Sequence, residues 1–110
     1  MSFTPGYSVS AGQKTGDLSS TSAIVAAPGA GRTLSIKSIA LNCGATAQNI
    51  TIENSDGTDI IGPIYLPING VFPQMQYAPG VFKANAANAS INVVASGSAN
   101  MTAVVECYVL

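Results

Sequence analysis

Three of the five carboxylates of this chain gather in one segment, ENSDGTD, which holds Glu53, Asp56 and Asp59. A calcium loop needs oxygen ligands at set spacings, but Ile52 occupies the first position of the EF-hand pattern. A glycosidase needs two carboxylates that face each other across a groove, whereas the tip of a tight hairpin projects them into water. The segment therefore favours a solvated turn, in which Asp56 tolerates left-handed backbone angles.

The other candidate nucleophiles have no base beside them in the sequence. The chain contains no His, the commonest general acid–base group near neutral pH. Cys107 lies in an apolar row, where burial would raise the pKa of its thiol, and the serines form no Gly-x-Ser-x-Gly motif. We therefore expect a protein that is not an enzyme and that has no metal and no cofactor. Cys43 and Cys107 are expected to be buried free thiols, although a bridge between them stays open.

Charge is scarce in this chain of 110 residues, since charged residues make up 8% and the net charge is −1. The four basic residues are scattered, so nucleic-acid binding is not expected. No apolar run reaches the ~20 residues of a membrane span, and the N-terminus does not resemble a signal peptide, so we expect synthesis in a cytoplasm and no membrane partner. A surface with so little charge suits a subunit of an assembly, or alternatively an extracellular β-domain.

The elements that would position these residues are short strands. Residues 90–110 are predicted to form a β-hairpin, because apolar residues alternate with polar ones on both sides of a turn at residues 97–99. The inner row of its second strand is Met101, Ala103, Val105, Cys107 and Val109. The opposite row is mixed and faces water or another subunit: Thr102, Val104, Glu106, Tyr108 and Leu110.

Further strands are expected at residues 23–27, 32–43, 48–54, 59–66, 71–77 and 81–84, each bounded by turn residues. The apolar face changes parity at Lys37-Ser38, which predicts a β-bulge. Asp56-Gly57 predicts a hairpin, while Pro63 and Pro73 favour edge strands. These patterns predict an all-β fold, an antiparallel β-sandwich of about eight strands whose favoured form is a jelly roll.

The first part of the chain differs from the rest. Residues 1–22 are rich in Gly, Ser and Thr and carry isolated apolar residues, with no sustained periodicity. We expect an extended N-terminal arm over residues 1–22, or a partly disordered tail, followed by a single domain over residues 23–110. In an arm, Phe3, Tyr7 and Val9 would dock on a neighbouring subunit.

From residue 23 onward the order of strands and turns resembles the small jelly-roll capsid decoration or cement proteins of tailed bacteriophages. The resemblance is carried by RTLSIKSIALN at 32–42, ITIE at 50–53, the Asp56-Gly57 turn, GVFKA at 80–84, ASINV at 89–93 and VVECY at 104–108. It implies a homotrimer on the outer capsid surface of the virion, assembled in the host cytoplasm. It also implies that the trimer bridges major capsid protein subunits, that it uses an N-terminal arm, and that it has no catalytic residues.

The residues expected to contact other subunits or the capsid are Phe3, Tyr7, Val9, Val104, Tyr108 and Leu110. A different function is open for the same fold, namely a carbohydrate- or receptor-binding module of a phage tail fibre or surface protein. In that alternative Tyr65 and Tyr77 would contribute to the binding surface, because tyrosine rings present an apolar face to a ligand.

Overall fold

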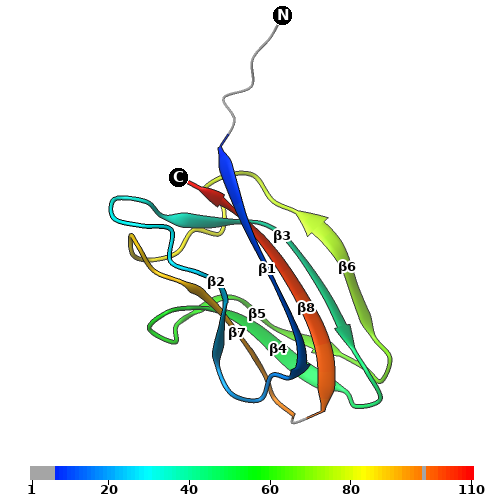
Figure 1. The fold of residues 1–110 in the computed structure, drawn as a ribbon. Coiled ribbons are helices and arrows are strands. Elements are labelled where there is room, and N and C mark those ends of the chain that lie inside the picture. Colours follow the sequence, from blue (N-terminus) through cyan, green and yellow to red (C-terminus); the bar gives the residue numbers. More distant parts are fainter. Residues whose placement is uncertain (1–6, 98) are drawn as a thin grey trace, which may run out of the picture.

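The computed structural model describes residues 7–97 and 99–110, and these form two four-stranded antiparallel sheets packed face to face (Figure 1). The first sheet has the strand order β1 (Ser8–Asp17), β8 (Asn100–Val109), β3 (Leu34–Cys43) and β6 (Val71–Gln76). The second sheet has the order β2 (Ser22–Val25), β7 (Ile91–Ala95), β4 (Gln48–Asn54) and β5 (Asp59–Leu66). The predicted all-β sandwich is confirmed. Among the described residues, no helix is long and apolar enough to cross a membrane.

The core lies between the sheets and follows the predicted alternation. The inner row of β8 is buried from Met101 to Cys107, and that of β7 is buried as well. In β3 the pairing register with β8 shifts between Ile36 and Ser38, so Ile36 and Ile39 both point inward and are fully buried. This is the bulge that the change of parity predicts. Cys43 and Cys107 are free and buried.

The predicted C-terminal hairpin is wrong. The two strands exist, but β7 pairs with β2 and β4 in the second sheet, while β8 pairs with β1 and β3 in the first. Two strands that follow each other in the sequence therefore lie in different sheets. Alternation along a strand determines which side is buried, but it does not say which strand lies alongside.

The expectation of an arm over residues 1–22 also needs correction. Residues 8–17 form β1, which pairs with β8 along its whole length, and Leu18 is buried in the core. The sandwich thus includes residues before 23. The outward side chains of β1 are exposed, so the sequence of this strand shows no apolar alternation. Residues 1–6, with Phe3, lie outside the described residues.

The remaining turn and edge predictions agree with the structure. The Asp56-Gly57 turn joins β4 to β5, with the Asn54 N–H donating to the Thr58 carbonyl over 2.8 Å. Pro63 and Pro73 lie on β5 and β6, which are edge strands.

The strand predicted at residues 81–84 is absent, because these residues make only an isolated bridge to β3.

Candidate docking surface

The acidic segment at residues 53–59 contains a turn that side-chain hydrogen bonds hold in place. The Asp56 carboxylate accepts the Thr58 hydroxyl over 2.7 Å and the Thr58 N–H over 3.0 Å, and its other oxygen accepts the Asn85 side-chain amide over 3.0 Å. These hydrogen bonds lower the pKa of Asp56. The one from the Thr58 hydroxyl has the largest effect, and those from the Thr58 N–H and from Asn85 come next. No group of three or more His, Cys, Asp or Glu in the part of the chain that the structure describes could hold a metal ion. These contacts account for the carboxylate as part of the turn.

The two thiols are packing groups. Cys43 donates its S–H to the Pro67 carbonyl over 2.7 Å. Burial raises the pKa of the Cys107 thiol to about 12, as its place in the inner row of β8 leads one to expect. A thiol with this pKa is protonated near neutral pH, so Cys107 does not offer a thiolate nucleophile there.

A different kind of site is formed by the solvent-facing side of the first sheet, which we call the outer face. In an antiparallel sheet, side chains of directly paired residues point to the same side. The outer row of β8 is Thr102, Val104, Glu106 and Tyr108, paired in that order with Thr15, Gln13, Ala11 and Val9 on β1. On β3 the corresponding partners are Asn42, Ala40, Ser38 and Ser35.

One end of the outer face carries two tyrosines, and we call Tyr7, Val9, Lys37 and Tyr108 the aromatic corner. The Tyr7 and Tyr108 rings meet edge to face, with centroids 5.9 Å apart. Val9 is the β1 partner of Tyr108, and the Lys37 Nζ lies 6.0 Å from the centre of the Tyr108 ring. Tyr7 is 49% exposed and Val9 is 46% exposed. The corner thus presents apolar surface next to a cation that is already engaged with a ring.

A polar network occupies the middle of the outer face. The Ser38 hydroxyl donates to Glu106 Oε1 over 2.9 Å, and the Gln74 side-chain amide donates to the same oxygen over 3.0 Å. Ser38 is only 2% exposed. Glu106 therefore has two fixed donors within the face, which reduces the cost of removing water from its carboxylate.

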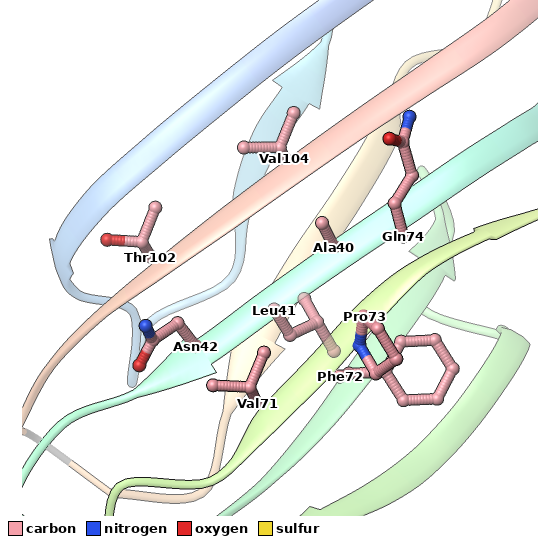
Figure 2. A pocket seen from close by; sticks show the side chains of 9 residues that line it. All are labelled: Ala40, Leu41, Asn42, Val71, Phe72, Pro73, Gln74, Thr102 and Val104. Carbon is pink, nitrogen blue, oxygen red and sulfur yellow. The ribbon is translucent and has the colours of Figure 1, made fainter.

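Beyond this network lies an open hollow of about 210 Å³ over β8, β3 and β6 (Figure 2). Its lining contains no charged residue: Ala40, Leu41, Asn42, Val71, Phe72, Pro73, Gln74, Thr102 and Val104. Val71 is largely exposed, and Pro73 has no N–H, so β6 lacks one backbone donor at that position. The hollow can accept an apolar side chain, with amide and hydroxyl groups of Asn42, Gln74 and Thr102 around it.

The structure brings four of the predicted contact residues onto the outer face. Tyr7, Val9 and Tyr108 meet in the aromatic corner, and Val104 lines the hollow. Leu110 lies just past β8, where its backbone pairs with Thr33 through hydrogen bonds of 2.8 and 3.1 Å. Sequence reasoning missed the contributions of β3 and β6 to the hollow, because only the strand order brings them beside β8.

The two tyrosines of the carbohydrate-binding alternative do not form a shared platform. Tyr65 is 63% exposed and lies on β5 of the second sheet. Tyr77 follows β6 of the first sheet and packs edge to face against Phe82, with ring centroids 4.9 Å apart. Of the two tyrosines of this alternative, Tyr65 is the one that offers an exposed ring to a sugar.

Comparisons with protein-family models, with curated proteins and with solved structures found no match. The chemistry of the outer face is therefore the basis for the function. It combines a ring cluster, an uncharged hollow and a carboxylate that already has donors.

Proposed function

We propose that this protein is a virion structural protein, a capsid decoration or cement protein that binds the outer capsid surface and stabilises the head by bridging major capsid protein subunits. The observation that carries the proposal is the outer face of the first sheet, with the aromatic corner at one end and the hollow at the other. The two four-stranded antiparallel sheets support the jelly-roll interpretation, since that fold consists of eight antiparallel strands in two sheets. The proposal includes a homotrimer, which is what the resemblance to phage decoration proteins implies.

The charges of the outer face support docking on another protein. Glu106 accepts from Ser38 and Gln74, and Lys37 lies over the Tyr108 ring. An interface over these groups would therefore bury no charge that lacks a partner. Burying an unpaired charge carries the largest free-energy cost when a surface loses water. Val104 and the lining of the hollow would supply the apolar burial that drives association.

The two sheets offer a matched pair of substitutions to test this. Val104 on β8 and Val94 on β7 are both half-buried and point outward from the middle of their sheets. Val104→Asp places a charge beside the hollow, and we expect it to weaken binding about tenfold or more, because an unpaired carboxylate would be buried in the interface. Val94→Asp should bind as the wild type does.

Binding is measured by co-sedimentation with shells assembled from the major capsid protein of the virus that encodes this chain. Thermal unfolding of both variants serves as the folding control. Equal binding by Val104→Asp, Val94→Asp and the wild type would contradict docking through the outer face.

The carbohydrate- or receptor-binding alternative has one observation in its favour, the exposure of Tyr65. A glycan array separates the two functions. Reproducible glycan binding that is lost in Tyr65→Ala, together with no binding to capsid shells, would favour the alternative over the decoration function.

A further inference from the structure

The four edges of the two sheets are not equally protected against pairing with another strand. On β6, Pro73 removes a donor and the register with β3 shifts. On β5, Pro63 does the same and the register with β4 shifts twice. β2 has only four residues and also contains a register shift. Prolines, bulges and short length are the common devices that prevent edge-to-edge association.

The fourth edge, β1, has no proline, no bulge and no short length, and its one inward-pointing charge, another such device, is Lys14, the partner of Ala103 in the inner row of β8. It runs for ten residues from Ser8 to Asp17, contains no proline, and pairs with β8 without a register shift. Its charged residues are Lys14 and Asp17, so the strand as a whole is neutral. A long, regular and neutral edge is a template for another strand.

The hydrogen-bond pattern identifies which backbone groups of β1 face outward. The N–H and C=O groups of Leu110 both bond to Thr33, on the β3 side of the last strand. Because these groups alternate in direction along a strand, the even-numbered residues of β8 bond to β3 and the odd-numbered ones to β1. The β1 partners of those odd-numbered residues are even-numbered, for example Gly12 opposite Val105.

The odd-numbered residues of β1 therefore direct their backbone groups toward the free edge. These are Val9, Ala11, Gln13, Thr15 and Asp17, and their side chains lie on the outer face. Outside the strand ladders, no backbone hydrogen bond found among the described residues involves any of the five. Groups of this kind are satisfied either by water or by another strand.

We propose that β1 pairs in antiparallel fashion with β1 of a second copy of this chain, about a two-fold axis at Gln13. In this register Gln13 faces Gln13 of the second copy, Ala11 faces Thr15, and Val9 faces Asp17. All of these are residues with outward backbone groups, so the pairing makes about ten backbone hydrogen bonds. The outer faces of the two copies become one continuous surface.

A second copy fits this edge because its charges allow the register. Lys14 lies opposite Gly12 of the second copy, so the like charges of the two lysines are not opposed. A register centred on Lys14 would place the two lysines directly opposite each other, which is unfavourable. The two-fold contact is isologous and satisfies both free edges at once. It goes beyond the proposed function and does not depend on capsid binding.

The first test is the mass of the full-length protein at micromolar concentration, measured by light scattering. The contact alone gives two copies, and the contact combined with a three-fold interface gives six. A mass of two or six copies is expected. A mass of one or three copies would overturn the proposal.

Charge reversal at the two-fold axis tests the register. Gln13→Lys and Gln13→Glu each place like charges directly opposite each other, and each should weaken self-association about fivefold. An equal mixture of the two variants should recover association through opposite charges. If both variants associate as the wild type does, or if mixing changes nothing, the register centred on Gln13 is wrong.

A proline on the free edge tests the backbone pairing itself. The Ala11 N–H points away from β8, so Ala11→Pro leaves the ladder with β8 intact while removing a donor from each copy. We expect dissociation to increase about tenfold or more, and the matched variant Ala11→Ser, which keeps the N–H, to associate normally. Circular dichroism verifies that both variants are folded. Equal association of the two would overturn the proposal, and the Gln13 variants decide the matter if Ala11→Pro does not fold.

Discussion

The two sheets share one core but differ on their solvent-facing sides. On the first sheet the long strands β1, β8 and β3 carry the aromatic corner and the hollow, and the Glu106 carboxylate has donors within the face. On the second sheet the outward pairs are polar or mixed, such as Thr51 with Val94 and Glu53 with Asn92. The difference teaches that the inner rows determine the fold, whereas the outer rows give each sheet its own surface chemistry.

The polar networks of the two sheets differ in position as well. In the first sheet the network of Ser38, Gln74 and Glu106 lies in the middle of the outer face. In the second it lies at the turn between β4 and β5, where Asn54 accepts the Asn85 N–H over 2.8 Å. The first network links β3, β6 and β8 across the outer face, and the second joins the turn to the loop before β7.

The largest expected effect comes from the point where Gly12 of β1 packs against Ile24 of β2. A Cβ on Gly12 would lie 1.6 Å from the Ile24 carbonyl oxygen, so β1 could not stay seated on β2. We expect Gly12→Ala to lower the free energy of unfolding by about 3 kcal/mol, measured by urea denaturation.

Gly97→Ala is the control for this substitution. Its Cβ would meet the Gln48 side chain at 3.3 Å rather than backbone, so the loss should be within about 1 kcal/mol. A Gly12→Ala variant as stable as the control would contradict the packing of β1 on β2.

A smaller effect is expected within the outer face. Ser38→Ala removes a buried donor to Glu106 and should cost about 1 kcal/mol of unfolding free energy. Thr51→Ala, at a half-buried outward position of the second sheet, should change it by less than about 0.5 kcal/mol. If the two substitutions cost the same, the outer face of the first sheet is not specially organised by its polar network.

The smallest effect is the pH dependence of the β4–β5 turn. Hydrogen bonds hold the pKa of Asp56 below its ordinary value of 3.8, so the native state favours the ionised carboxylate. Its contribution to stability is complete above the unfolded pKa and is lost as the pH falls through the folded pKa.

The wild type should therefore be slightly more stable than Asp56→Asn at neutral pH, and the difference should shrink as the pH falls below 3.8 and through the folded pKa. Thermal unfolding over this pH range measures the difference. A difference that is independent of pH would show that the carboxylate charge does not stabilise the turn.

Much of the fold was predictable because local chemistry determines it. Alternation identified the inner row of β8, the change of parity located the bulge in β3, and Pro63 and Pro73 marked edge strands. These features depend on the sterics and hydrogen bonding of neighbouring residues, which a sequence displays directly. β1 escaped prediction because its outward side chains are exposed and its inward ones are glycine or polar, so no apolar row marks it.

By itself, the sequence determined which side of most strands is buried and where the β4–β5 hairpin turns. Only the tertiary structure decided that β7 and β8 belong to different sheets, and that β6 and β3 lie beside β8 to form the hollow. The physical reason is that side-chain alternation is a property of one strand, whereas the choice of neighbouring strands depends on packing the whole core. The aromatic corner illustrates both, since Tyr7 and Tyr108 could be named as contact residues from the sequence, but their meeting follows from the pairing of β1 with β8.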